Sequence, residues 1–364
     1  MRLDILELLP CMIFRTVTRA AIVLAGLLLT PLGAQEPAPW RDRSPHGVQF
    51  VAVDRNVRLE VLDWGGVGRP LVLLSGLGNT AHVFDEFAPK LAVGFHVYGV
   101  TRRGFGASSI PTDGYNADRL GDDVLAVVES LKLKQPILAG HSVAGEELSS
   151  VGSRHPDRVA GLVYLEAGYS FAFDDGRGMT LEQYQEMLKR APPLPEMKTS
   201  DRANFADFQA WMKRIGSVTI PEAELRESWI PAADGSVSGP RSPASVSEAI
   251  MAGYKKFVNV RAPALAIFAV PRDFGPWLFS NSDPASHAAA KAFSADFDDK
   301  MEQQAKAFER GVPGARVVRL RNANHYVFLS NEAEVLQEMR AFAAAPLTQF
   351  NFHFAKITLC VLNP

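Results

Sequence analysis

Ser142 is the residue of this sequence whose surroundings best suit nucleophilic chemistry. Residues 136–139 read PILA and predict a buried parallel strand, and GHSVAG (140–145) then packs small residues around the serine. A helix is expected from there until just before the proline at 156. A strand, a tight turn and a helix can hold a serine in a strained, accessible position, usually as G-x-S-x-G. Here Ala144 replaces the last glycine and a glycine follows it. A simple glycine- and serine-containing loop fits the same short pattern, so the other residues must support this interpretation.

A serine becomes a good nucleophile only beside a histidine base that a carboxylate orients. His325 suits that role because RNANHYVFLSN (321–331) places it in a loop between a predicted strand and the last predicted helix. His141 flanks the serine and is expected to be structural, whereas His82 follows a glycine-rich loop and could line the pocket. The other histidines are expected at the surface or in packing: His46, His96, His155, His287 and His353.

Two carboxylates are candidates for the orienting acid. Asp273 follows a predicted strand in AVPRDFGPW, and Glu166 follows the preceding strand in VYLEAG. We predict Asp273, since it lies on the later strand and gives the chain order Ser142, Asp273, His325 that accompanies such a serine turn. Glu166 remains the alternative, and either acid could simply pair with a neighbouring arginine such as Arg272.

Backbone N–H groups are expected to stabilise the negative charge that develops on a substrate oxygen. Val143 follows the nucleophile at the start of a helix, whose dipole adds to the effect. Leu77 is the second predicted donor, because the loop SGLGN (75–79) follows a buried strand and lets backbone approach a substrate. A glycine loop can also hold phosphates, but this one lacks both G-x-G-x-x-G and the lysine of a nucleotide-binding loop.

Strands and helices alternate along most of the chain, which predicts a parallel sheet covered on both faces. Two strands, 47–53 and 57–64, come first, and further strands are expected at 71–74, 96–100, 162–165, 263–270 and 315–320. Helices are expected at 82–92, 117–133, 285–311 and 331–344. The fold class is therefore α/β, with core segments at 47–170 and 261–346.

Residues 171–260 interrupt the alternation. Apolar residues at helical spacing in 181–190 and 205–215, separated by prolines, predict a helical cap inserted between two strands. The alternative is that these helices extend the core. The tail at 347–364 shows no clear period, so no structure is predicted for it.

The N-terminal segment, residues 1–34, resembles a secretory signal peptide. Arg15 and Arg19 precede the apolar run AAIVLAGLLL, and small residues ending at Ala34 follow it. The run is shorter than the roughly 20 residues that span a bilayer, so we predict cleavage near Ala34 rather than a stable membrane span. Met12 is an alternative start. A linker at 35–46 would follow, and the mature protein is expected to be secreted or periplasmic.

The net charge and the cysteine count limit the kinds of partner and site that the sequence predicts. The 364 residues are 47% hydrophobic and 21% charged with a formal net charge of −2, which is typical of a globular protein with a sizeable core. This charge favours neither nucleic acid nor an anionic membrane surface as a partner. The two cysteines, Cys11 and Cys360, lie near the termini and predict neither a disulfide framework nor a cysteine metal site. Nothing in the sequence indicates an oligomeric state.

Five segments together resemble the α/β-hydrolase fold family over roughly residues 47–345. They are SGLGN (75–79), RRGFGASS (102–109), GHSVAG (140–145), the strand leading to Asp273, and NANHYVF (322–328). The resemblance implies a mostly parallel sheet flanked by helices and a serine hydrolase active site. Many members carry His-Gly in the first loop, where this chain has Ser75. Epoxide hydrolases and haloalkane dehalogenases of the family use aspartate at the position of Ser142, which argues against those activities.

We therefore expect a hydrolase that cleaves carboxylic esters through an acyl-enzyme, with no metal or organic cofactor. The aromatic residues of the cap favour a small-molecule ester with an apolar moiety as substrate. Amidase or peptidase, lactonase and carbon–carbon bond hydrolase activities are alternatives on the same fold. A ligand-binding receptor without catalysis is an alternative from a different class, although a complete serine, acid and histidine set argues against it.

Overall fold

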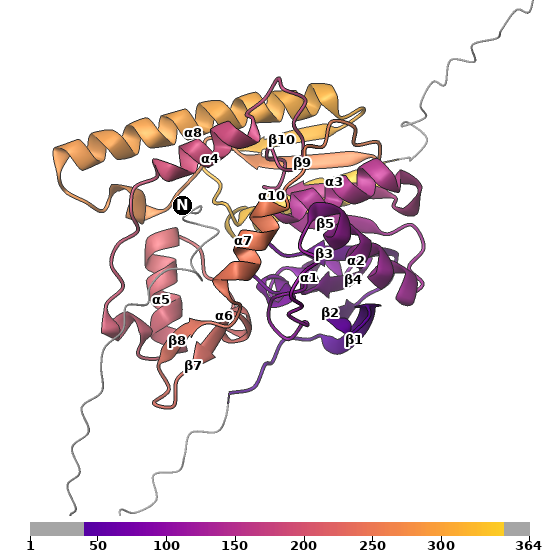
Figure 1. Cartoon of the computed structure of the whole chain (residues 1–364), viewed down its shortest axis with the longest axis horizontal. Helices are drawn as coiled ribbons and strands as arrows, with labels where there is room; N and C mark the ends of the chain where they lie inside the picture. The colour runs from indigo at the N-terminus through magenta and orange to yellow at the C-terminus, as the bar shows by residue number, and fades with distance from the viewer. Residues whose placement is uncertain (1–39, 346–364) are drawn as a thin grey trace, which may run out of the picture.

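A computed structural model describes residues 40–345, and its centre is one eight-stranded sheet (Figure 1). The strand order is β1-β2-β4-β3-β5-β6-β9-β10. β2 pairs antiparallel with β1 and β4, and all other neighbours are parallel, so the predicted mostly parallel α/β sheet is confirmed. The strands are β1 (Gly47–Asp54), β2 (Val57–Gly65), β3 (Arg69–Leu74), β4 (Phe95–Val100), β5 (Ile137–His141), β6 (Gly161–Leu165), β9 (Ala264–Ala269) and β10 (Arg316–Leu320).

Helices cover both faces of the sheet, which explains why the central strands are apolar throughout. Every residue of β5, β6 and β9 is buried. On one face Tyr164 of β6 joins two helices, because its hydroxyl lies 3.0 Å from Ser149 Oγ and its ring packs against Phe308. On the other face Lys90 and Glu332 form an ion pair between two more helices. The helices are α2 (Ala117–Ser130), α3 (Ala144–Arg154) and α8 (Pro284–Gly311) on the first face, and α1 (Ala88–Leu91), α9 (Val327–Ser330) and α10 (Glu332–Ala344) around the second.

The segment after β3 differs from the single helix predicted at 82–92. It forms a 3-10 turn, η1 (Ala81–Phe84), and then the short helix α1. Pro89 lies in the first turn of α1, where its missing N–H costs nothing. In the interior of one continuous helix the same proline would remove a hydrogen bond and clash with the preceding turn. The proline therefore divides the segment.

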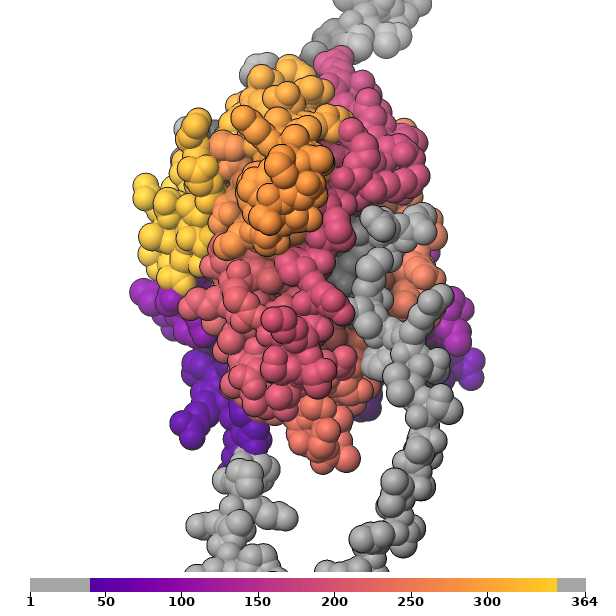
Figure 2. All heavy atoms as spheres, turned by 90° about the vertical axis from the view of Figure 1, so that its left-hand side faces the viewer, coloured from indigo at the N-terminus to yellow at the C-terminus, as the bar shows by residue number. Residues whose placement is uncertain are grey.

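The chain between β6 and β9 forms the inserted region. It contains α4 (Leu181–Lys189), α5 (Phe205–Gly216), α6 (Glu222–Ser228) and α7 (Ala244–Ala252), with the 3-10 turn η3 (Thr199–Arg202). Figure 2 shows this region, pink to coral, beside and below the orange start of α8. A small antiparallel pair, β7 (Trp229–Pro231) and β8 (Val237–Pro240), also lies here and was not predicted. Its strands are short and end in proline, so they carry little strand signal.

Two predictions, the signal peptide at 1–34 and the tail at 347–364, lie outside the described residues 40–345, as does the first part of the predicted linker at 35–46. The remaining short turns of the described range are η2 (Pro156–Arg158) and η4 (Pro276–Phe279). Among the helices of residues 40–345, none combines the length and the hydrophobicity needed to cross a membrane.

Candidate active site

Ser142 occupies the turn between β5 and α3 with a backbone φ of +54°. Such a left-handed conformation is strained for a residue with a side chain and is common at functional turns. The close packing that this turn needs is provided by Gly145, so position 144 can be alanine. A Cβ on Gly145 would lie 1.9 Å from the carbonyl oxygen of Ala167, so glycine is required there. The methyl group of Ala144 packs against Gly140 instead, and it fits there because Gly140 has no side chain.

His325 lies beside the serine, as expected from the sequence. Its Nε2 is 3.0 Å from Ser142 Oγ, and both residues are 1% exposed. His141 supports this arrangement, because its Nε2 lies 3.1 Å from the carbonyl oxygen of His325 and can donate to it. The rings of His141 and His325 also pack at 4.6 Å between centroids. His141 is thus structural, as predicted.

The acid that contacts His325 is Glu166, which corrects the predicted choice of Asp273. Glu166 Oε2 lies 3.0 Å from His325 Nδ1, and the residue is fully buried. The carboxylate of Asp273 instead accepts a hydrogen bond from the N–H of Gly275 at 2.8 Å. Its own N–H donates to the carbonyl of Ala323. Asp273 therefore stabilises its own loop, while the structure brings together Ser142, His325 and Glu166.

The ends of two neighbouring strands hold Glu166 in place. Directly after β6 it has a φ of +49°, and its N–H donates to the carbonyl of Ile267 in β9. Its Oε1 accepts the N–H of Ala269 at 3.1 Å. This backbone bend turns the side chain across the end of β9 towards His325. No sequence pattern indicates a positive φ at a glutamate. The prediction therefore relied on chain order and chose Asp273.

Arg272, which the sequence suggests only as an ion-pair partner for either acid, is a buried residue of this site. Its Nη2 donates to Glu166 Oε2 at 2.8 Å and to the hydroxyl of Tyr169 at 2.9 Å, and it also contacts His325 Nδ1. The Tyr169 hydroxyl donates to the same Glu166 oxygen. Burial, and then the positive charge of Arg272, lower the pKa of His325 well below its usual value. The histidine is therefore neutral at neutral pH and able to accept a proton.

The family profile described as alpha/beta hydrolase fold matches residues 69–332, which is more than half of the chain. The chain belongs to the α/β-hydrolase fold family. It is 34% identical over 116 residues to the 2-hydroxymuconate semialdehyde hydrolase of Pseudomonas sp. (strain CF600), covering 30% of this chain and 41% of that protein. It is 33% identical over 121 residues to the bifunctional esterase/perhydrolase DCH of Acinetobacter calcoaceticus, covering 32% and 44%.

The chain thus spans less than half the length of these curated relatives. Among solved structures, the E-2-(acetamidomethylene)succinate hydrolase superposes with a TM-score of 0.57 at 19% identity, covering 82% of this chain and all of that one. At this identity the likeness shows the fold alone. The family and the relatives support a hydrolase and leave the bond that it cleaves open.

In this α/β hydrolase, the loop between β3 and η1 lies against the nucleophile. A Cβ on Gly76 would lie 2.9 Å from His141 Nδ1 and 3.2 Å from Ser142 Cβ, so the absence of a side chain permits this close approach. Leu77 and Val143 belong to one buried apolar cluster with Val246 and Ile250 of α7. Residues of the cap therefore share a buried apolar cluster with the two predicted oxyanion residues.

Arg102, which pairs with Glu147, holds the backbone of this loop from the core side. Arg102 donates to the carbonyl oxygens of Ser75 and Gly76 at 2.8 and 3.3 Å and forms an ion pair with Glu147. These bonds hold the loop from the core side through two of its carbonyl oxygens.

Glu224 of α6 holds the same loop from the cap side. Its Oε1 accepts from Asn79 Nδ2 at 2.9 Å and its Oε2 accepts from Thr80 Oγ1 at 2.5 Å. The N–H of Thr80 also donates to the carboxylate, at 3.1 Å. Burial raises the pKa of Glu224 to about 7, although these hydrogen bonds oppose the shift. A cap residue thus positions the loop that carries Leu77.

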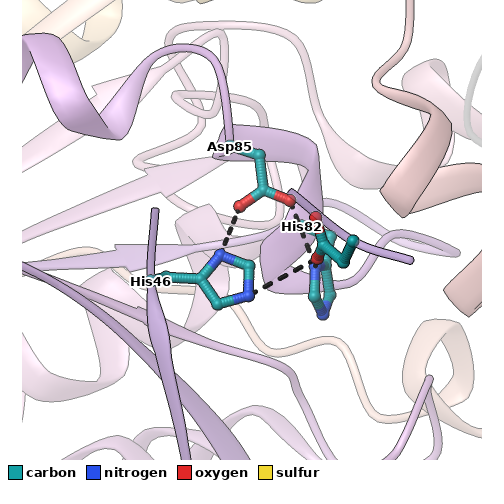
Figure 3. Close-up of side chains that lie close together, drawn as sticks. His46, His82 and Asp85 are labelled. Carbon is teal, nitrogen blue, oxygen red and sulfur yellow. Dashed lines mark hydrogen bonds and ion pairs between the residues drawn. The ribbon is translucent and has the colours of Figure 1, made fainter. Parts of the chain in front are cut away.

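His82 does not line the active site, contrary to the possibility raised by the sequence. It lies in η1, where its ring contacts Asp42, His46 and Asp85 (Figure 3). Burial disfavours its charged form, but hydrogen bonds to Asp85 and Glu60 raise its pKa to about 11. His82 and its neighbours form a separate cluster of polar side chains.

Proposed function

We propose that this α/β hydrolase cleaves carboxylic esters through an acyl-enzyme formed on Ser142. The observation that carries the proposal is the continuous series of contacts from Ser142 to His325 and from His325 to Glu166, each 3.0 Å long. A buried serine, a neutral histidine and a carboxylate in this order are the set needed to activate a hydroxyl group.

In the first half of the reaction, Ser142 Oγ attacks the ester carbonyl carbon and His325 Nε2 accepts its proton. Glu166 accepts a hydrogen bond from Nδ1–H and stabilises the imidazolium that forms. The N–H groups of Val143 and Leu77 would hold the oxyanion. When the ester bond breaks, His325 donates the proton to the leaving alcohol. Water, activated by the same histidine, then hydrolyses the acyl-enzyme and restores Ser142.

Aromatic side chains next to the histidine support a substrate with an apolar moiety. Tyr169 lies 6.3 Å from His325 and 5.4 Å from Phe171, between ring centroids. Tyr184 of α4 and Tyr254, just after α7, pack on the same group. Because Ser142 is 1% exposed, the acyl or alcohol group would be enclosed by these rings and the cap.

The residue at the turn supports attack on a carbonyl carbon, and the relatives include an esterase among hydrolases of other bonds. Serine at 142, in place of the aspartate used for epoxides and haloalkanes, suits attack on a carbonyl carbon. One relative is named an esterase/perhydrolase, whereas another is named a semialdehyde hydrolase. Amides, lactones and ketones flanked by a carbon leaving group are therefore the substrates to test beside esters.

The test is turnover of a panel of chromogenic short-chain esters by the wild type, Ser142→Ala and a control, Ser149→Ala. Ser149 is a buried serine of α3 that bonds to Tyr164 and not to His325. We expect Ser142→Ala to lower kcat by several orders of magnitude and Ser149→Ala to retain most activity. Unchanged turnover in a folded Ser142→Ala protein, or turnover of the amide or ketone substrates alone, would contradict the proposal.

We also propose that the protein is exported. The support is the pattern of basic, apolar and small residues in 1–34. N-terminal sequencing of protein from the periplasm or medium should find a mature chain that begins near residue 35. Recovery of the mature protein from the cytoplasm with its first residues intact would contradict this.

A further inference from the structure

Four potential metal ligands meet where the segment before β1 packs on η1. His46 Nδ1 lies 2.9 Å from Asp85 Oδ1, and His82 Nδ1 lies 3.1 Å from Asp85 Oδ2. Asp42 Oδ2 is 3.5 Å from His46 Nε2 and 3.3 Å from His82 Nδ1. One donor atom from each of the four residues lies within 4.8 Å of the other three. Figure 3 shows His46 and His82 with the carboxylate of Asp85 between them.

Local structure explains why the side chains converge. A 3-10 turn has three residues per turn, so residues three apart project from the same side. His82 and Asp85 have this spacing, with His82 inside η1 and Asp85 at its C-terminal end. Asp42 and His46 are four residues apart on the segment that lies over this turn. Two sequence-distant segments therefore each contribute one imidazole and one carboxylate.

We propose that Asp42, His46, His82 and Asp85 bind one divalent transition-metal ion of the Zn²⁺ type. Zn²⁺ prefers four nitrogen and oxygen ligands in a tetrahedron, at bond lengths of about 2.0–2.2 Å. That geometry separates neighbouring donor atoms by roughly 3.3 Å. The contacts in the cluster, from 2.9 to 3.5 Å, use both ring nitrogens of His46 and both carboxylate oxygens of Asp85. A set with one donor atom from each residue lies within 4.8 Å, so small side-chain rotations would bring the four donors to this spacing around an ion. Two imidazoles make Ca²⁺ and Mg²⁺ poor candidates, because both prefer oxygen ligands only and a higher coordination number.

The surroundings contain the outer groups that orient metal-binding histidines. If His82 binds through Nδ1, its Nε2 faces Glu60 Oε1 at 3.7 Å. Glu60 is buried, and its Oε2 accepts a hydrogen bond from Thr101 Oγ1 at 2.7 Å. A carboxylate behind the imidazole fixes the ring and raises its basicity as a ligand. His46 is held separately, with its ring at 5.6 Å from that of Trp64.

An ion can reach the site from solvent. A cavity of about 980 Å³ opens over Asp42 and Asp85, and Trp40 and Pro221 line its wall. The Asp42 side chain is 26% exposed, whereas that of Asp85 is 3% exposed. Asp42 would therefore close the site after the ion has entered.

The site would be structural rather than catalytic. Four protein ligands leave no open position for water or substrate, which is the arrangement of structural zinc sites. The ion would hold the segment before β1 against η1, directly after the loop that ends at Asn79 and Thr80. This inference does not depend on the proposed ester hydrolysis.

The first measurement is metal stoichiometry on the full chain after treatment with a chelator and dialysis. We expect one Zn²⁺ per chain by elemental analysis and by calorimetric titration, with a higher Tm when Zn²⁺ is added. Ca²⁺ and Mg²⁺ should not compete. The alternative is that the cluster is only a set of ion pairs between protonated histidines and carboxylates. In that case the wild type would bind no Zn²⁺ stoichiometrically and its Tm would not change, which would overturn the proposal.

Variants then test which residues bind the ion. Asp42→Asn and His46→Gln should each weaken Zn²⁺ binding at least tenfold and abolish the Tm increase. His96→Gln is the matched control, because His96 and Asp63 form a similar 2.9 Å pair that no third ligand from residues 40–345 joins. It should bind Zn²⁺ like the wild type. Wild-type binding in both cluster variants, or loss of binding in His96→Gln, would also overturn the proposal.

Replacement by Co²⁺ adds a test of geometry that does not depend on variants. The cobalt-loaded wild type should show the intense visible absorption of a tetrahedral centre. The weak absorption of a six-coordinate centre would contradict four protein ligands.

Discussion

Glu166 and Asp273 follow adjacent parallel strands of the same sheet, yet only one of them reaches the histidine. Glu166 is fully buried and lies 3.0 Å from His325 Nδ1. Asp273 is partly exposed and accepts the N–H of Gly275, two residues further along its own loop. Both positions give the same order of serine, acid and histidine along the chain. Chain order therefore cannot choose between them, and the direction of the backbone after each strand does.

The loops after β6 and β9 also contribute different groups to the surroundings of His325. The loop after β6 carries the acid, while the loop after β9 carries Arg272, which donates to that acid at 2.8 Å. Asp273 holds the second loop in shape, since its backbone N–H and carbonyl bond to Ala323 and Asn324. The two loops thus act together on His325, one with a negative and one with a positive charge.

Among the variants that distinguish the two acids, Glu166→Gln should lower kcat most. Glutamine keeps the size of the side chain but removes the charge that stabilises the imidazolium and fixes its tautomer. In a comparable triad the equivalent change lowers kcat by about 10⁴. We expect a loss of this order in steady-state turnover of an ester, with the fold intact by circular dichroism. Turnover within tenfold of the wild type would remove Glu166 from the catalytic set.

Arg272→Met should mainly affect stability. Arg272 and Glu166 form a buried ion pair with both side chains almost inaccessible. Removing one partner leaves a buried charge uncompensated, which costs about 3–5 kcal/mol. Thermal or denaturant unfolding measures the loss. The double variant Arg272→Met/Glu166→Gln should lose less than the sum of the single losses, because the two side chains interact. Additive losses would show that the pair contributes nothing.

The pH dependence of kcat/KM tests the electrostatics of the same pair. The pKa of His325 is lowered by burial and by Arg272, so the histidine gains its proton only below about pH 6.5. Activity should therefore be level around neutral pH and fall as the pH drops through this lowered pKa. In Arg272→Met the fall should begin at higher pH, since one cause of the lowering is gone. An unchanged profile in that variant would show that Arg272 does not influence the base.

Asp273→Asn should have the smallest effect. The asparagine oxygen can still accept the N–H of Gly275, so the turn survives. We expect kcat within about twofold of the wild type and a change in stability of no more than about 0.5 kcal/mol, as for surface substitutions. A large fall in kcat with unchanged stability would restore Asp273 as the acid.

Much of the fold followed from the sequence because it depends on patterns that are local. The apolar runs in β3, β5, β6 and β9 predicted buried parallel strands, and the structure has them. The small residues around Ser142 predicted the turn. The division of 82–92 was missed although Pro89 marks it in the sequence. The β7–β8 pair was missed because tertiary packing decides which short segments pair.

The site was predictable only in part. Ser142 and His325 were found because a turn motif and a loop before the last helix mark them. Two weaker signals favoured Glu166: it lies in the apolar run LVYLEAG, whereas Asp273 precedes a glycine by two residues, a spacing typical of a local Asx turn. The cluster of Asp42, His46, His82 and Asp85 had no signal, because its two halves are brought together only by the fold.

Labelling of Ser142 by a fluorophosphonate tests the central claim most directly, since it needs no knowledge of the natural substrate. Intact-protein and peptide mass spectrometry would follow the rate of labelling in the wild type, Glu166→Gln and Asp273→Asn. If Ser142, His325 and Glu166 act as a unit, the wild type and Asp273→Asn are labelled at Ser142 at similar rates and Glu166→Gln far more slowly. Rapid labelling of Glu166→Gln together with slow labelling of Asp273→Asn would contradict the assignment.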